Sequence, residues 1–129
     1  MSNPAALNLP DPLDIDDARV AARRLAEKRR EAEDQHRKAI EAAADAERDY
    51  RREYAQAILQ AEGTAAAREA QAKADSAHAA YLRDLAAGMV KAATERLRGL
   101  EGERSILKSL IDWSARMRLD ENDQTRGGT

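Results

Sequence analysis

Ala61-Glu62-Gly63-Thr64 is the clearest interruption in a helix-forming pattern that runs from about Asp14 to about Leu119. Gly63 can adopt the left-handed backbone conformation that ends a helix, because it has no Cβ atom to clash. The Thr64 hydroxyl can accept a hydrogen bond from a free backbone N–H at the start of a following helix. The stretch therefore predicts that one helix ends and another begins here, and that the two form an antiparallel hairpin.

The first predicted helix begins near Asp14 and reaches Ala61. Asp14 is a favourable N-cap, and the acidic residues that follow it suit the positive end of the helix dipole. Apolar positions recur along this helix at steps of three and four residues, which indicates one packed stripe. The stripe consists of Ala18, Ala22, Leu25, Ala32, His36, Ile40, Ala43, Tyr50, Tyr54, Ala57, Ile58 and Ala61.

The second predicted helix runs from Ala65 to about Arg118. Gly99 and Gly102 lie inside it, and each costs up to about 1 kcal/mol relative to alanine. We expect the helix to continue through them; the alternative is a break there that leaves a short third helix after Gly102. The packed stripe of this helix begins with alanines and continues with Tyr81, Leu82, Leu85, Met89, Val90, Ala93, Leu97, Leu100, Leu107, Leu110 and Ile111.

A turn centred near Gly63 sets the register of the hairpin. Residues whose numbers add to about 126 then face each other, so that large side chains meet alanines, as close packing requires. Leu25 meets Leu100 in this register.

The composition predicts an all-α fold with a thin core. Charged residues make up 36% of the chain, aromatic residues 3%, and phenylalanine is absent. A chain rich in Ala, Glu, Arg and Leu is typical of coiled coils and long helices. Such a seam buries little apolar surface while each ordered residue costs about 1–2 kcal/mol, so we expect self-association. We assign residues 13–119 to the helical hairpin, residues 1–12 to a disordered leader and residues 120–129 to a disordered tail.

Acidic and basic side chains alternate along the chain, with 22 Lys and Arg, 24 Asp and Glu, and a net charge of −2. This mixing argues against a large footprint for duplex DNA, which depends on clustered basic side chains. The absence of cysteine excludes disulfides and thiolate metal sites and fits a reducing cytoplasm. The first residues lack the features of a signal peptide, and no stretch has the length of a membrane span. We expect a cytoplasmic protein that does not enter a membrane.

Two pairs of residues, Glu33 with His36 and Asp75 with His78, have the spacing of metal ligands on one helix face. The expected register separates the two histidines by about 18 Å along the helix axis, too far for them to share an ion within one chain. A metal site assembled between two chains remains an alternative. The sequence contains no phosphate-binding loop and no nucleophile with an adjacent base. We expect no catalytic residue, no cofactor, no metal within the chain and no enzymatic activity.

The segment from Glu103 to Arg118 holds the only tryptophan and the densest large aliphatic residues. These side chains cover more than one helix face, so those that do not meet the first helix need another partner. We assign a candidate protein-partner surface to Ile106, Leu110, Trp113 and Met117. The alternatives are that Trp113 is an ordinary packing residue, or that it stacks on a base of single-stranded nucleic acid. In the nucleic-acid alternative the phosphates contact Arg23, Arg24, Arg104, Lys108 and Arg116.

Three segments resemble a group of small helical proteins encoded by bacteriophages: the A-E-G-T turn at 61–64, the R-E-A at 68–70 and the L-x-x-L-I-x-W at 107–113. The similarity spans roughly residues 20–118. It implies an accessory role in the cytoplasm of a bacterial host, beside DNA recombination or replication proteins, and supplies no catalytic residues. We therefore predict a self-associating helical adaptor or scaffold with a protein partner; a virion assembly factor is a further alternative.

Overall fold

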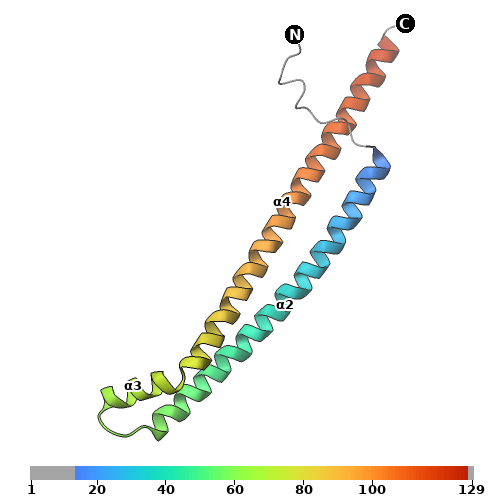
Figure 1. The fold of residues 1–129 in the computed structure, drawn as a ribbon. Helices are drawn as coiled ribbons and strands as arrows, with labels where there is room; N and C mark the ends of the chain where they lie inside the picture. The colour runs from blue at the N-terminus through green and yellow to red at the C-terminus, as the bar shows by residue number, and fades with distance from the viewer. Residues whose placement is uncertain (1–13, 128–129) are drawn as a thin grey trace, which may run out of the picture. The chain divides into compact units, whose positions relative to one another are not determined.

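The computed structural model describes residues 14–127 of the 129-residue chain. Over that range the backbone is all-α, and its three helices are α2 (Ile15–Gln60), α3 (Ala65–Asp75) and α4 (Ala77–Gly127) (Figure 1). The chain divides into two compact units: unit 1 contains α2 up to Arg29 and α4 from Gly99, and unit 2 is Arg30–Arg98. Within each unit the two long helices run antiparallel, which confirms the predicted helical hairpin.

The turn between α2 and α3 has the local geometry that its sequence predicts. Gly63 has a φ of +106°, and it is the only described residue outside the negative-φ region. Thr64 is the N-cap of α3, and its hydroxyl accepts a hydrogen bond from the N–H of Ala67 at 3.2 Å. One turn later, a guanidinium nitrogen of Arg68 donates to the carbonyl oxygen of Ile58 at 2.9 Å, which ties α3 to the end of α2.

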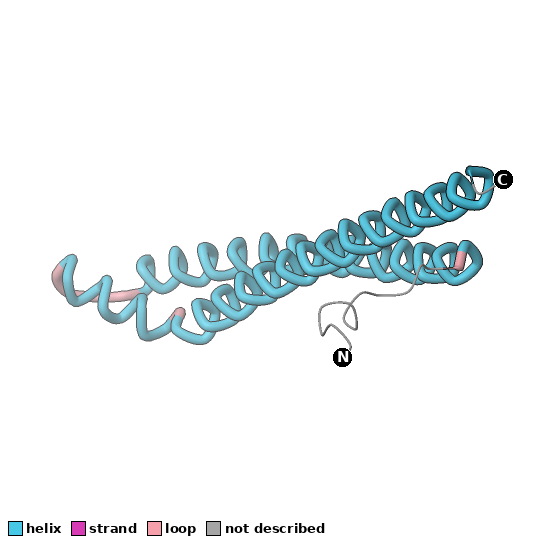
Figure 2. The backbone as a smooth tube through the Cα atoms, turned by 90° about the horizontal axis from the view of Figure 1, so that it is seen from above, coloured by secondary structure: helices cyan, strands magenta, loops and turns pink. Residues whose placement is uncertain are grey.

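The second predicted helix is broken at Ser76, a feature that the sequence analysis did not anticipate. Ser76 is only 1% exposed, and its hydroxyl donates to the carbonyl oxygen of Ala72 at 2.6 Å. Its backbone has φ −100° and ψ 9°, so the regular helix stops there and α4 begins at Ala77. A serine that bonds to the preceding turn competes with the helical ladder and bends the chain. Figure 1 shows α3 turned out of line with α4, and Figure 2 marks the two short connections as loops.

The break at Ser76 also explains why the register of the hairpin differs from the expected one. In unit 2, His36 Nε2 lies 3.1 Å from Thr94 Oγ1, and in unit 1 Arg29 pairs with Glu101 at 3.1 Å. The two residue numbers add to 130 in both pairs, instead of the expected value near 126. Because α3 folds as a separate element, the connection between the two long helices is longer than a simple turn. Each residue of α2 therefore faces a residue of α4 that lies about four positions, or one helical turn, further along the chain than expected.

Small residues form most of the contact between α2 and α4. One set of buried or half-buried positions on α4 recurs every seven residues, the repeat of a coiled coil. They are Ala79, Ala86, Ala93, Leu100, Leu107 and Ser114. On α2 the corresponding positions are Ala18, Leu25, Ala32, Ala39 and Ala46. Leu25 and Leu100, which the expected register paired, are both buried in unit 1.

The predicted stripe of the second helix is correct at Val90, Leu97, Leu100, Leu107 and Leu110, which are buried or half-buried, and wrong at most of its earlier large residues and at Ile111. Tyr81, Leu82, Leu85 and Met89 were assigned to the seam, but all four are exposed. The alanines next to them occupy the seam instead, because an alanine contact lets two backbones approach closely and leaves no space for larger side chains. On α2 the assigned stripe is largely correct, although Ile40 and Ala22 are exposed.

The end of α4 also differs from the prediction. The helix is unbroken at Gly99 and Gly102, as expected, so the additional short helix is α3 and not a segment after Gly102. It then continues to Gly127, through most of the stretch 120–129 that was predicted to be disordered. The stretch 120–126 contains neither proline nor glycine, the two residues that most disfavour a helix interior. The predicted leader, residues 1–12, lies outside the described residues.

Replacement of Gly63 with alanine should lower the free energy of unfolding by about 1–2 kcal/mol, because a Cβ atom disfavours positive φ. Gly88→Ala is the matched control, since an added Cβ there meets no atom within 4 Å. The control should raise the stability by up to about 1 kcal/mol, because alanine is the better helix former. Urea denaturation followed by circular dichroism measures both values. Effects of the same sign and size would contradict the special role of Gly63.

Candidate interaction surface

Arg83 links α4 to α2 in unit 2. Its guanidinium carbon lies 4.1 Å from the centre of the Tyr50 ring, a cation–π contact. Its Nε lies 3.2 Å from Asp84 Oδ1 and 3.9 Å from Glu47 Oε2. The hydrogen bond with Asp84 is the main reason that the pKa of Arg83 is raised. Tyr50 in turn packs near Tyr54, with ring centres 6.1 Å apart. Arg83 and the two tyrosines thus add contact area between α2 and α4 in unit 2, where the alanines alone fill little space.

The two histidines have separate surroundings. Thr94 Oγ1 donates its single hydrogen to the carbonyl oxygen of Val90 at 2.9 Å, so His36 Nε2 must donate to Thr94. The His78 ring stacks near Tyr81, with ring centres 6.5 Å apart. Within the described part of the chain, no three His, Asp or Glu side chains gather as metal ligands would.

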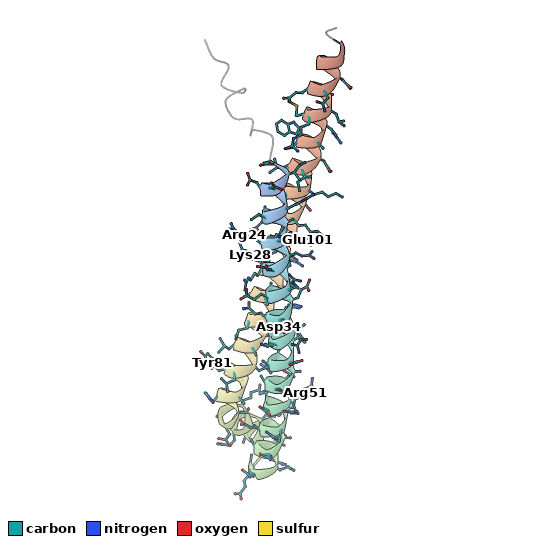
Figure 3. All side chains as sticks on the ribbon, turned by 90° about the vertical axis from the view of Figure 1, so that its right-hand side faces the viewer. Arg24, Lys28, Asp34, Arg51, Tyr81 and Glu101 are labelled. Carbon is teal, nitrogen blue, oxygen red and sulfur yellow. The ribbon has the colours of Figure 1, made fainter. Side chains whose placement is uncertain are left out.

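Ion pairs on the outer face of α2 follow the predicted spacing of three and four residues. Asp34, which Figure 3 labels on α2, accepts a hydrogen bond from Arg37 at 2.6 Å and lies 3.1 Å from Lys38 Nζ. Both contacts lower the pKa of Asp34 below its usual value, and the hydrogen bond from Arg37 has the larger effect. Arg51 pairs in the same way with Glu47. Exposed pairs of this kind contribute little to stability and are typical of a solvated helix face.

Unit 2 exposes a contiguous apolar surface along α4. Leu82, Leu85 and Met89 are 44%, 49% and 59% exposed, and steps of three and four residues place them on one face of the helix. Met89 also borders an open groove of about 540 Å³ between α2 and α4. Alanines form the floor of this groove, and its polar rim consists of Gln35, Lys38 and Arg96.

The predicted partner surface lies on α4 in unit 1. Ile106 is 63% exposed, whereas Leu110, Trp113 and Met117 are half-buried. Steps of four, three and four residues place the four side chains along one side of the helix. The structure therefore brings them together, and their contact with another protein remains a prediction.

The five basic residues of the nucleic-acid alternative all lie in unit 1 and are all exposed. Arg24 lines an open groove with Lys28 and Glu103, and Arg104 lines a neighbouring groove that shares Leu25 and Leu107 with the first. Figure 3 labels Arg24, Lys28 and Glu101. Arg104 lies 3.7 Å from Glu101, which also pairs with Arg29. Carboxylates thus interrupt the basic surface, and Arg23, Lys108 and Arg116 line neither groove.

The exposed Leu82, Leu85 and Met89 are the part of the candidate surface that the sequence analysis missed. Large apolar residues were taken as core because size is the usual signal of burial. The signal that identifies the true seam is the recurrence of Ala79, Ala86 and Ala93 every seven residues.

Comparison with known proteins adds no relative: no protein-family model, no curated protein and no solved structure matches this chain. The molecule is a small all-helical protein with three helices over residues 14–127. Within that range, none of its helices combines the length and the apolar character that crossing a membrane requires.

Replacement of Arg83 with methionine should lower the unfolding midpoint, because it removes the cation–π contact with Tyr50 and the charge contact with Glu47, both of which join α4 to α2. Arg48→Met is the control, because Arg48 is highly exposed and pairs only with neighbours on its own helix. Thermal unfolding followed by circular dichroism compares the two variants. An equal decrease in both would show that Arg83 contributes no more than a surface charge.

Proposed function

We propose that this chain is a non-enzymatic helical adaptor or scaffold that self-associates. The observation that carries this proposal is the apolar surface on α4 that a single copy leaves exposed, formed by Leu82, Leu85 and Met89. Among the described residues, by contrast, the buried hydrophobic side chains are four alanines and two leucines. Leu82, Leu85 and Met89 therefore contribute their apolar area to the surface of unit 2 and not to its core.

The energetics of burial favour association. Full burial of a leucine or methionine side chain is worth about 1.5–3 kcal/mol, whereas an alanine provides much less apolar area. Large exposed apolar patches on soluble proteins mark interaction sites. A second helical surface placed against α4 would supply the stabilisation that the alanine seam provides only in part.

A biological setting follows from the sequence resemblance. The A-E-G-T turn and the segment that ends at Trp113 support an accessory role in a bacteriophage, in the cytoplasm of the bacterial host. In this role the chain would bridge copies of itself to a DNA recombination or replication protein bound at Ile106, Leu110, Trp113 and Met117. A virion assembly factor would use the same surfaces and differ in the identity of the partner.

Light scattering should give a mass well above the 14.2 kDa of a single chain at micromolar concentration. Leu85→Lys should weaken the association about tenfold or more, because it places a charge in the buried contact. Leu59→Lys is the matched control, since Leu59 is 79% exposed and lies outside the surface on α4. Circular dichroism checks that both variants remain helical. A helical wild-type protein that scatters as a monomer would contradict the proposal.

The nucleic-acid alternative is tested by fluorescence anisotropy with a labelled single-stranded oligonucleotide. The adaptor proposal predicts no binding at low salt, because carboxylates interrupt the basic surface of unit 1. Binding that falls steeply with added salt, and that is reduced by Arg24→Ala more than by Arg48→Ala, would instead favour phosphate contacts in unit 1.

A further inference from the structure

Unit 2 presents one face on which the groove and the exposed apolar side chains lie end to end, and we call it the pairing face. The groove lies between α2 and α4, and four alanines line it: Ala39, Ala42, Ala92 and Ala93. Met89 borders the groove, and steps of three and four residues continue its line along α4 to Leu85 and Leu82. The pairing face therefore has a hollow at one end and large exposed side chains at the other.

Charged side chains on α2 flank the same face in a fixed order. Gln35 and Lys38 line the groove, and steps of three and four residues extend their line of positions along α2 in both directions. The line reads Glu31, Gln35, Lys38, Ala42, Asp45, Asp49 and Arg52, and all but the half-buried Asp49 are exposed.

Shape and charge change together along the pairing face. In unit 2, positions whose numbers add to 130 lie level on the two helices. Lys38 is therefore level with the hollow, and Arg96 reaches across the groove to donate a hydrogen bond to Gln35. Asp45 is level with Leu85. The hollow thus has a basic border, and the large side chains have an acidic one.

The shape of the pairing face is complementary to itself. A second copy can be turned by 180° about an axis that lies between the two faces and crosses both helices, level with Met89 on α4. Helix α2 of one copy then lies antiparallel on α2 of the other, and α4 lies antiparallel on α4. Leu85 of each copy meets the hollow of the other at Ala92, so that a large side chain fills the space that an alanine leaves.

The same axis pairs opposite charges on α2. Positions on α2 whose numbers add to 83 face each other across it. Lys38 of one copy then meets Asp45 of the other, and each such pair occurs twice because of the two-fold symmetry. Glu31 meets Arg52 in the same way. A partner of unrelated sequence would not require the two ends of the face to match in reversed order, so this order favours a second copy as the occupant.

These charges remain accessible, because their partners within the chain are exposed neighbours on the same helix. Lys38 pairs with Asp34 at 3.1 Å, and Asp45 pairs with Arg48 at 3.3 Å. Such pairs are weak, so a second copy can replace them. Asp34 would keep its shorter contact with Arg37, at 2.6 Å.

We propose that a second copy of this chain docks antiparallel on the pairing face of unit 2, with Leu85 of each copy in the hollow of the other. This inference rests on the self-association proposed above and adds its geometry. The pairing face lies within residues 31–96, all of which belong to unit 2. The candidate partner surface of unit 1 takes no part in the contact.

Disulfide cross-linking tests the position of the axis, because the chain contains no cysteine. Ala42→Cys should convert most of the protein to a covalent dimer on mild oxidation, since position 42 lies next to the axis and a disulfide needs Cα atoms within about 7 Å. Ala44→Cys is the matched control, because Ala44 is also exposed on α2. Two residues turn a helix by about 200°, so position 44 points away from the pairing face and this variant should stay monomeric on a non-reducing gel.

A charge exchange tests the pairing of Lys38 with Asp45 independently. Lys38→Glu and Asp45→Lys should each weaken association about tenfold or more, because like charges then meet across the contact. The double variant should restore the wild-type affinity, and so should an equal mixture of the two single variants, because every contact in a mixed pair joins opposite charges. Positions 38 and 45 are about 10 Å apart along their own helix, so a contact within one chain does not produce this rescue. Analytical ultracentrifugation gives the affinities, and circular dichroism checks that each variant is helical.

The outcomes separate the two proposals. A wild-type protein that is monomeric at micromolar concentration would overturn both the self-association and this geometry, and would leave the pairing face to another occupant. A protein that self-associates, but that cross-links no better through Ala42→Cys than through Ala44→Cys and shows no rescue by charge exchange, would overturn the antiparallel pairing and leave self-association standing. Selective cross-linking at position 42 together with rescue is the expected result.

Discussion

Alanine at the contact between α2 and α4 is the constraint on which the rest of the structure depends. A side chain of one methyl group lets two helices approach closely, and Ala32 on α2 and Ala79 on α4 are both buried in unit 2. Close approach excludes larger side chains from the same faces, so Leu85 and Met89 point outward. The alanine contact itself buries little area, and polar pairs such as His36 with Thr94 and Arg29 with Glu101 help to align each unit.

Two local breaks decide how this contact is reached. Gly63 reverses the chain because its positive φ is accessible without a Cβ clash, and Thr64 starts the next helix by capping it. Ser76 then ends that helix by bonding to the turn before it. The short α3 between the two breaks shifts α4 by about one turn against α2, so a buried serine hydroxyl sets which residues of the long helices meet.

The candidate interaction surfaces follow from the same arrangement. Ile106, Leu110, Trp113 and Met117 were identifiable from the sequence, because a cluster of large residues that exceeds one helix face needs more than one partner. The exposure of Leu82, Leu85 and Met89 could not be predicted from the sequence, because large apolar residues next to alanines are normally assigned to the core. Their role as surface became clear only when the alanines were found buried. The proposed adaptor function rests on this outward placement of apolar side chains.

The sequence by itself determined the helices and the turn, because both depend on local properties: the helix propensities of alanine, leucine and charged residues, and the freedom of φ at Gly63. It also showed that the long helices would pair through a stripe with steps of three and four residues. Only the tertiary structure decided the register and the buried face of α4. Several stripes with similar spacing coexist on a helix rich in apolar residues, and the choice among them depends on how closely α2 can approach and where the break at Ser76 starts α4.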